Sequence, residues 1–389
     1  MPGTRRIGIL TGGGDVPGLN SVIKSVVYRS TELGFAVLGI RRGWLGLTNL
    51  APGSDSDPEH VLPLDRANTR RIDRTGGTML HTSRTNPARM TRDGLPPHLA
   101  ADAARYLTAD GVYDLTPVVL ENIARLGLDH LVVIGGDDTL GYAHRIAASG
   151  ISLVAIPKTM DNDVRDTEYC IGFSTAVTRA KELINRQRTT LGSHERIGVF
   201  RIFGRDSGFS ALHIAYVTSA RCLIPESPFA VERLVALLAA DKRANPSRYA
   251  FVIVAEGATW IGAKVGELGE PDGFGHRRKV DVGEALAEEI RRRSGEDAIV
   301  SQLTYDLRSG DPDSFDQMVA TTFANIAVDL IADGASGRMI AIRSGRYTHV
   351  AVPDPRLGPR TVDVARYYNT ERFRPRYDGR EGFSVMLSD

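Results

Sequence analysis

The chain has 389 residues, of which 48 are Lys or Arg and 47 are Asp or Glu, so its formal net charge at pH 7 is +1. This balance gives no electrostatic reason to expect nucleic acid or an anionic membrane as a partner. Charged or turn-forming residues interrupt every apolar stretch before the ~18 residues that a membrane span needs, so we expect a cytoplasmic protein. The length suggests two or three domains.

Two residue types stand out in the composition. The only cysteines, Cys170 and Cys222, cannot form a disulfide framework and lie beside no His/Cys cluster, so we expect both to be buried apolar residues. Glycine is the one excess, with 40 residues against a usual share of ~7%. The segments in which these glycines lie are therefore the first candidates for functional loops.

The first half of the chain alternates between predicted strands and helices. An apolar run at 6–10 ends in a glycine loop at 11–15, and helical periodicity follows over 19–33 and stops at Gly34. The pattern then predicts a strand at 35–40, a helix at 116–127, a strand at 130–134, a helix at 139–149 and a strand at 152–156. Such alternation is typical of a parallel sheet covered by helices on both faces.

A second α/β unit follows. We predict helices at 174–191, 209–220, 231–240, 282–293 and 314–332, and strands at 196–202, 249–255, 299–305, 338–342 and 348–352. The segments 51–58 and 266–275 are rich in Pro, Gly and Asp, which indicates surface loops.

Four predicted strand ends carry loops rich in glycine, acid or hydroxyl groups, at 11–18, 135–139, 157–163 and 203–208. Ligands of doubly wound sheets bind at the carboxyl ends of strands. The first loop is not a dinucleotide fingerprint, because position 17 is proline, and it is not a P-loop. Its bare N–H groups before a helix could bind a phosphate or could form only a tight turn.

The second and third loops bring together Asp137, Asp138, Asp161 and Asp163, with Lys158 and Thr159 between them. Converging carboxylates repel one another unless a cation compensates, which favours Mg²⁺ and its phosphate. They also offer a base for a substrate hydroxyl. The alternative is that some of them only cap the helices that follow.

Basic residues gather as well. Seven arginines lie between 66 and 92, at positions 66, 70, 71, 74, 84, 89 and 92, and we expect most to be surface residues. Arg196, Arg205 and Arg308 lie beside strand ends and are better placed to clamp a phosphate. Acids facing arginines suit a reaction between two phosphorylated molecules. Glu256, at another strand end, could accept a hydrogen bond from a sugar hydroxyl or could be structural.

These loops, in this order, resemble the phosphofructokinase family from Ile7 to about Tyr377. The matching positions are 11–15, 17–20, 135–137, 159–163, Gly204-Arg205 with Gly208, Glu256, Tyr305 and Arg308. The resemblance implies two doubly wound α/β domains with mainly parallel sheets and an active site in the cleft between them. Residues 1–172 plus 307–357 would form the phosphoryl-donor domain, and residues 173–306 plus 358–389 the fructose 6-phosphate domain.

The resemblance also implies roles for individual residues. Asp161 would be the base that takes the proton of the 1-hydroxyl of fructose 6-phosphate, and Asp137 would hold Mg²⁺. Thr159 and Asp163 would position the phosphoryl group, and Arg205 would balance its charge. The other implied substrate contacts are Phe203, Gly204, Glu256, Tyr305 and Arg308, with Arg196 reaching in from a neighbouring subunit of a homodimer or homotetramer.

The implied donor-binding residues are Gly13, Gly14, Arg84, Asp138 and Lys158. ATP-using members typically have glycine at positions 138 and 158. A carboxylate at 138 would project toward the α-phosphate of ATP, at a cost on the order of several kcal/mol where screening is poor. The Lys158 ammonium suits a small tetra-anion such as pyrophosphate. The resemblance therefore favours reversible phosphoryl transfer from pyrophosphate to fructose 6-phosphate in glycolysis and its reverse.

Some positions depart from the family pattern. The stretch 305–310 stands where many members have Gly-His-x-Gln-Arg-Gly-Gly, and Ile299 stands where an arginine is expected. Residues 95–126 and the tail past 357 look like additions. An ATP-dependent phosphofructokinase and a catalytically silent regulatory subunit stay open as alternatives. An NAD or lipid kinase would not be expected to have these loops, and the failed fingerprint disfavours a dehydrogenase.

Overall fold

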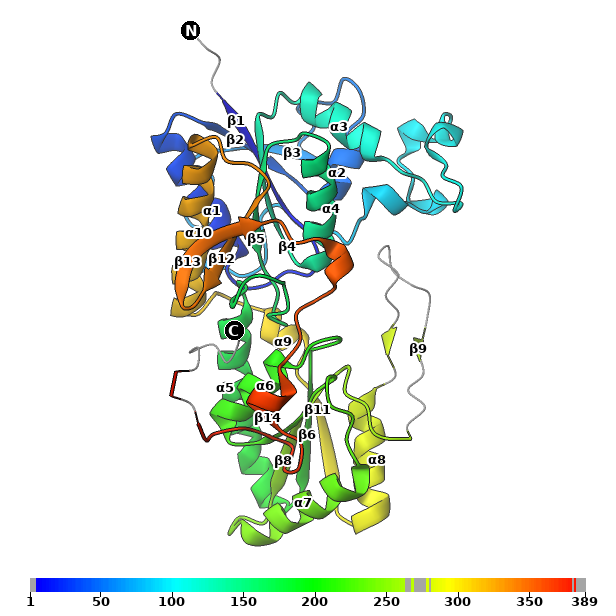
Figure 1. Ribbon diagram of the computed structural model, residues 1–389, viewed down its shortest axis with the longest axis vertical. Helices are drawn as coiled ribbons and strands as arrows, with labels where there is room; N and C mark the ends of the chain where they lie inside the picture. The colour runs from blue at the N-terminus through cyan, green and yellow to red at the C-terminus, as the bar shows by residue number, and fades with distance from the viewer. Residues whose placement is uncertain (1–4, 263–266, 269–277, 280, 380, 383–389) are drawn as a thin grey trace.

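The computed structural model describes residues 5–262, 267–268, 278–279, 281–379 and 381–382. Two helix-covered sheets lie one beyond the other along the long axis of the molecule (Figure 1). The larger sheet has seven strands in the order β13-β12-β5-β4-β1-β2-β3, and the smaller has four in the order β11-β6-β8-β7.

The larger sheet is mainly parallel; only the pairs β2–β3 and β12–β13 in it are antiparallel. Its strands are β1 (Arg6–Thr11), β2 (Ala36–Ile40), β3 (Val61–Leu64), β4 (His130–Gly135), β5 (Leu153–Pro157), β12 (Arg338–Arg343) and β13 (Arg346–Ala351). Helices α1 (Leu19–Glu32) and α10 (Ser314–Ala332) cover one face, and α2 (Trp44–Asn49), α3 (Thr116–Arg125) and α4 (Asp137–Ala148) cover the other.

Strand β4 illustrates why these sequences form buried strands. Val132 and Ile134 pack into the core beneath α1 and α10, whereas Leu131 and Val133 pack into the core beneath α3 and α4. Side chains alternate between the faces of a strand, so a continuous apolar run is what a sheet covered on both faces requires.

The smaller sheet is entirely parallel. It consists of β6 (Ile197–Ile202), β7 (Arg221–Leu223), β8 (Ala250–Ala255) and β11 (Ala298–Gln302), packed with α5 (Phe173–Ser193), α6 (Phe209–Thr218), α7 (Val231–Ala244) and α8 (Val282–Ser294). Short elements complete this part: β9 (Glu267–Leu268), β10 (Arg278–Lys279), α9 (Tyr305–Arg308), α11 (Val364–Tyr367), β14 (Tyr368–Asn369) and β15 (Arg374–Pro375).

The strand order of each sheet changes direction next to its first strand. In the larger sheet β1 lies between β2 and β4, and in the smaller sheet β6 lies between β8 and β11. Such a switch point opens a crevice at the carboxyl ends of the strands. Residues that follow β1, β4 and β5 line the same cleft as residues that follow β6, β8 and β11. The predicted fold class is therefore confirmed; the exact domain bounds stay a prediction.

Most predicted elements are confirmed to within a few residues, with two kinds of difference. Eight short elements were not predicted, because each is only two to six residues long: α2, β3, β7, β9, β10, α11, β14 and β15. The strand expected at 299–305 ends at Gln302, and Tyr305 instead begins α9, where Leu307 N–H donates to the Thr304 carbonyl at 3.1 Å. Pairing of β11 with β6 stops at Gln302 opposite Arg201.

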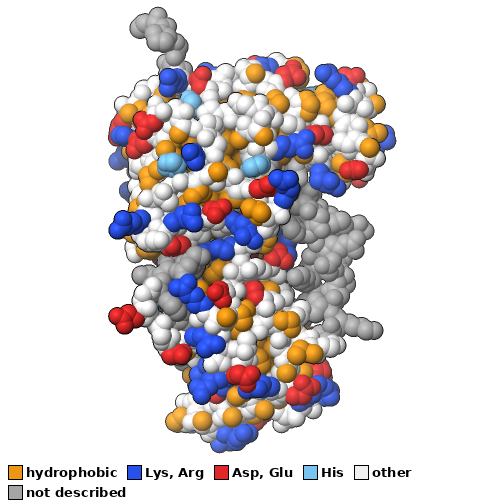
Figure 2. All heavy atoms as spheres, in the orientation of Figure 1, with side chains coloured by type: hydrophobic (Ala, Val, Ile, Leu, Met, Phe, Trp, Pro, Cys, Tyr) orange, Lys and Arg blue, Asp and Glu red, His pale blue; other side chains and the backbone are white. Residues whose placement is uncertain are grey.

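Other expectations from the sequence have mixed outcomes. Cys170 and Cys222 are both free and fully buried, as expected. Residues 51–58 form a turn-rich loop, whereas most of 266–275 lies outside the described residues. Among the helices that the structure describes, none is long and apolar enough to cross a membrane. On the face seen in Figure 2, basic and acidic side chains are interspersed, in keeping with the balanced charge.

Candidate active site

The carboxyl ends of the two sheets border a cleft of about 1480 Å³. It collects most of the residues singled out from the sequence, although they come from loops up to about 300 positions apart. Those that line it are Gly13, Gly14, Arg84, Asp137, Asp138, Lys158, Thr159, Asp161, Asp163, Phe203, Arg205, Glu256, Tyr305 and Arg308.

The glycine loop after β1 packs so closely on the start of α4 that side chains would not fit. A Cβ at Gly12 would lie 2.6 Å from Thr139 Oγ1, and a Cβ at Gly135 would lie 2.3 Å from Thr139 Cβ. Gly13 has φ +81°, a conformation that favours glycine. Thr139 therefore holds the loops after β1 and β4 together at the switch point.

Three cations converge on this loop. Lys158 is only 4% exposed, and its Nζ donates a hydrogen bond to the Gly14 carbonyl at 2.6 Å. A Cβ at Gly14 would lie 2.7 Å from Arg308 Nη1. Arg84 also lines the cleft, because Thr82 Oγ1 and Gly13 N–H tie residues 82–83 to the loop. Burial, with Arg308 and Arg84 nearby, lowers the pKa of Lys158 to about 8.

The segment after β5 holds the central acids in an irregular loop that Asn162 fixes. Asn162 has φ +54°, its Nδ2 donates to the Glu168 carbonyl, and its Oδ1 accepts from Cys170 N–H. Asparagine tolerates this left-handed conformation better than most residues. Ser210 of α6 donates to the Met160 carbonyl at 2.6 Å. The two acids that flank Asn162 are thereby held rigidly; neither of them caps a helix.

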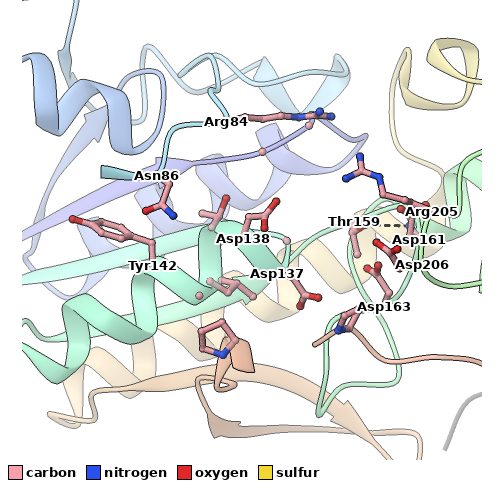
Figure 3. Close-up of a pocket in the computed structure, with 18 of the residues that line it drawn as sticks. Arg84, Asn86, Asp137, Asp138, Tyr142, Thr159, Asp161, Asp163, Arg205 and Asp206 are labelled. Carbon is pink, nitrogen blue, oxygen red and sulfur yellow. Dashed lines mark hydrogen bonds between the residues drawn. The ribbon is translucent and has the colours of Figure 1, made fainter. Parts of the chain in front are cut away.

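The Asp161 carboxylate is held so that one of its oxygens can still accept a hydrogen bond. Its N–H donates to Thr159 Oγ1 at 3.1 Å, as drawn in Figure 3, while its Oδ1 is buried without a hydrogen-bond partner among the described residues. Burial and the neighbouring Asp163 and Glu256 raise the pKa of Asp161 well above its ordinary value. Burial and Asp137 raise the pKa of Asp163 to about 7. This crowding of acids is the setting of a proton acceptor.

Asp137 and Asp138 occupy the first turn of α4. Burial and the adjacent Asp138 raise the pKa of Asp137 to about 7. The described residues contain no ready cluster of three or more His, Cys, Asp or Glu ligands. The Asp137 carboxylate nevertheless fits Mg²⁺, because this ion is commonly held by only one or two carboxylates together with phosphate oxygens and water. Figure 3 shows Asp138 between Asp137 and the outer cleft residues Asn86 and Tyr142.

The opposite wall comes from the smaller sheet. Gly257 N–H donates to the Gly204 carbonyl at 3.0 Å, and a Cβ at Gly257 would lie 1.8 Å from the Arg205 carbonyl oxygen. The loops after β6 and β8 therefore cross in close contact, which places Arg205 and Glu256 on one wall. Figure 3 shows Arg205 beside Asp161, Asp163 and Asp206.

Arg308 and Tyr305 come from α9. The Arg308 guanidinium lies 4.4 Å from the ring centre of Phe203, and its contact with Gly14 brings it to the donor loop as well. Tyr305 is 75% exposed at the edge of the cleft. Arg308 thus bridges the two walls, a position that the sequence did not predict.

Two predicted residues do not line this cleft. Gly204 has φ +121° and serves the loop crossing instead. Arg196 precedes β6 at the amino end of the strand and pairs with Asp297 at 3.3 Å, so it lies away from the cleft of its own subunit. Ligands of parallel sheets bind at the opposite end. The approach of Arg196 to the site of a neighbouring subunit stays a prediction.

Several polar residues of the cleft were missed, notably Arg201, Asp206, Gln302 and Thr304. Arg201 could have been noticed, because it is a single charge inside the otherwise apolar strand 197–202. Asp206 follows a predicted site residue directly. Gln302 and Thr304 carry no comparable signal in the sequence, since their strand was predicted to run past them.

Glycine loops and converging cations face one cleft together with Asp161, whose Oδ1 has no hydrogen-bond partner among the described residues. This arrangement suits the transfer of a phosphoryl group, and comparison with known proteins defines the class. The family model for phosphofructokinase matches residues 6–331. The chain belongs to the phosphofructokinase family.

Similar proteins of this family carry two kinds of name. A pyrophosphate–fructose 6-phosphate 1-phosphotransferase of Amycolatopsis methanolica is 39% identical over 372 residues, which cover 95% of this chain and 99% of that protein. An ATP-dependent 6-phosphofructokinase 3 of Streptomyces coelicolor is 35% identical, covering 94% and 99%. Among solved structures, a pyrophosphate-dependent phosphofructokinase from Marinobacter aquaeolei has a TM-score of 0.74 at 16% identity, covering 99% and 92%, and supports the fold.

Proposed function

We propose that this chain is a pyrophosphate-dependent phosphofructokinase, which transfers phosphoryl reversibly between pyrophosphate and the 1-hydroxyl of fructose 6-phosphate. The products are fructose 1,6-bisphosphate and orthophosphate, so the reaction belongs to glycolysis and its reverse. The observation that carries the donor assignment is the pair of side chains Asp138 and Lys158 in a cleft of the phosphofructokinase type. The names of the relatives at 38–39% identity agree with it.

Asp161 is the proposed base. Its Oδ1 is buried and has no hydrogen-bond partner among the described residues, so it can accept the proton of a sugar hydroxyl. Thr159 fixes its backbone, and Arg205 lies beside it on the facing wall. The arginine would balance the charge of the transferring phosphoryl group. Phe203, Glu256, Tyr305 and Arg308 would bind the sugar phosphate.

The donor would lie on the loop of Gly13 and Gly14. The cations Lys158 and Arg84, which line the cleft beside this loop, would provide countercharge for both phosphates of pyrophosphate. Asp138 adds a negative charge on the side toward Tyr142, where a longer donor would extend. Charge and bulk there disfavour ATP.

Mg²⁺ is the proposed cofactor, with Asp137 as its protein ligand. Asp163 lies close enough for the Asp137 charge to raise its pKa, so a bound cation would act on both carboxylates. When bound, the ion would neutralise phosphate charge. It would also hold Asp137 ionised, because metal binding displaces the proton of a carboxyl group whose pKa is raised.

Arg196 lies at the far end of β6, so a role at a sugar-phosphate site requires a second subunit. We propose a homodimer or homotetramer in which Arg196 reaches the neighbouring cleft, and we expect the enzyme to act in the cytoplasm. The division into a donor domain (1–172 plus 307–357) and an acceptor domain (173–306 plus 358–389) is part of the same proposal.

The ATP-dependent alternative draws on the relatives named for ATP at 33–36% identity. A direct test supplies Mg²⁺ and fructose 6-phosphate with pyrophosphate, ATP or no donor, and couples fructose 1,6-bisphosphate formation to NADH oxidation. We expect turnover with pyrophosphate and at least about 100-fold lower kcat/KM with ATP. Preference for ATP would refute the donor assignment, and turnover with neither donor would favour a silent subunit.

A further inference from the structure

Arg201 is a charged residue near the carboxyl end of the otherwise buried strand β6. Its strand neighbours Val199, Phe200 and Ile202 are buried, yet the Arg201 side chain is 14% exposed and lines the cleft. Burial of a cation is unfavourable unless anions or hydrogen bonds compensate. The surroundings of Arg201 therefore indicate what it does.

Two carboxylates flank this guanidinium. Nη2 donates a hydrogen bond to Glu256 Oε2 at 3.2 Å, and Nε lies 3.8 Å from Asp281 Oδ1 without a hydrogen bond. Asp281 is already occupied, because its Oδ1 caps α8 by accepting from Gly283 N–H and its Oδ2 accepts from Gln302. Glu256 is the partner whose orientation depends on Arg201.

The register of the sheet makes this contact possible. Arg201 pairs with Val254 of β8 on one side and with Gln302 of β11 on the other, so it sits at the carboxyl ends of three adjacent strands. Among the described residues, Arg201 alone donates a side-chain hydrogen bond to the Glu256 carboxylate. In that described part of the chain, Arg201 makes no hydrogen bond or ion pair with Asp161 or Lys158.

The contact between Arg201 and Glu256 matters because negative charge surrounds the site of the phosphoryl acceptor. Four acids line this half of the cleft, although the phosphoryl acceptor, fructose 6-phosphate, is itself an anion. They are Asp161, Asp163, Asp206 and Glu256. Without Arg201, the Glu256 carboxylate would be free to rotate and would add uncompensated negative charge beside the sugar phosphate. Preorganised groups bind more tightly because less side-chain entropy is lost on binding.

We propose that Arg201 is a positioning residue that determines affinity for the phosphorylated acceptor, by holding the Glu256 carboxylate toward the sugar and compensating its charge. The inference rests on the proposed function, in which Glu256 binds the sugar. It predicts an effect on the acceptor but not on the donor or the chemical step.

The test compares Arg201→Met and Arg201→Lys with the wild type, and uses Arg293→Met as a matched control. Arg293 is a half-buried, ion-paired arginine of α8 that does not line the cleft. We expect Arg201→Met to raise KM for fructose 6-phosphate by about 10- to 100-fold, the usual scale for a charged hydrogen bond. Values of kcat and of KM for pyrophosphate should stay within about 3-fold.

Arg201→Lys should recover part of the lost affinity, and Arg293→Met should behave as the wild type. Glu256→Gln should change KM for fructose 6-phosphate less in the Arg201→Met background than alone, because the two side chains act together. Calorimetric titration of fructose 6-phosphate without pyrophosphate gives the same comparison for binding only.

Unchanged KM for fructose 6-phosphate in an active Arg201→Met enzyme would overturn the inference alone. Parallel changes in kcat and in KM for pyrophosphate would also overturn it, since they indicate general disruption of the cleft. A wild-type protein that turns over no fructose 6-phosphate would overturn the proposed function, and the inference with it.

Discussion

The ammonium of Lys158 donates a hydrogen bond to the backbone carbonyl of Gly14, 2.6 Å away. A side chain from the end of β5 is thereby fixed on the loop after β1, across the intervening strand β4. The contact places a buried cation where the proposed donor phosphates lie.

This burial makes donor binding sensitive to pH. The pKa of Lys158 is lowered to about 8, so its ammonium is charged below that pH and loses its charge as the pH rises through it. We therefore expect the dissociation constant of pyrophosphate to rise above about pH 8 in the wild type by more than it does in Lys158→Arg. Calorimetry across pH 6.5–9.5 measures it. Lys158→Arg, which stays charged, is the control; an identical profile for both proteins would contradict the role of Lys158.

Asp138 should control the choice of donor. Asp138→Gly removes both the bulk and the charge that face the outer cleft, so kcat/KM with ATP should rise by about 10-fold or more while the value with pyrophosphate falls. Asp138→Asn removes the charge but keeps the volume, and so separates the two causes. If neither variant gains activity with ATP, donor choice is set elsewhere in the cleft.

Asp161 should be needed for chemistry rather than for binding. Asp161→Asn keeps the volume but cannot accept the proton, so kcat should fall by about 100- to 10,000-fold. Calorimetry should show fructose 6-phosphate binding within about 3-fold of the wild type. Asp311→Asn, whose side chain is 74% exposed, is the control. A loss of less than 10-fold in kcat would require another base.

Asp316 should be a major stabilising residue. It is fully buried on α10 and accepts hydrogen bonds from Tyr169 Oη at 2.5 Å, from Gly172 N–H at 2.8 Å, and from Thr175 N–H and Oγ1 at 2.8 and 2.5 Å. Asp316→Ala leaves these donors unpaired, so the free energy of unfolding should fall by about 3–5 kcal/mol.

Urea denaturation measures this loss of stability. Asp316→Asn, which keeps one acceptor oxygen, should lose less, and Asp311→Ala should change the free energy of unfolding by less than about 0.5 kcal/mol. Equal midpoints for Asp316→Ala and the wild type would show that this network contributes nothing.

Periodicity sufficed to predict most of the fold because its main strands are continuous apolar runs such as 130–134 and its helices carry clear terminal signals such as Gly34. The loops of the site could be predicted as well, since glycine and acid at strand ends are visible in the sequence. Their meeting in one cleft depended on strand order, which the family resemblance supplied.

The remaining features depend on tertiary contacts. The end of β11 at Gln302 is set by pairing with Arg201, and the placement of Arg308 on the donor loop depends on Gly14 and Phe203, which are distant in sequence. The place of Arg196 depends on the direction of β6, because Arg196 precedes this strand and so lies at the end away from the cleft of its own subunit.

The donor can be identified most directly by competition in one tube. The wild-type protein is incubated with fructose 6-phosphate, Mg²⁺ and equal concentrations of pyrophosphate and ATP, and the mixture is followed by ³¹P NMR. The account predicts that the pyrophosphate signal falls as those of orthophosphate and fructose 1,6-bisphosphate rise, while the ATP signals stay constant. Consumption of ATP with formation of ADP, and pyrophosphate left intact, would contradict it.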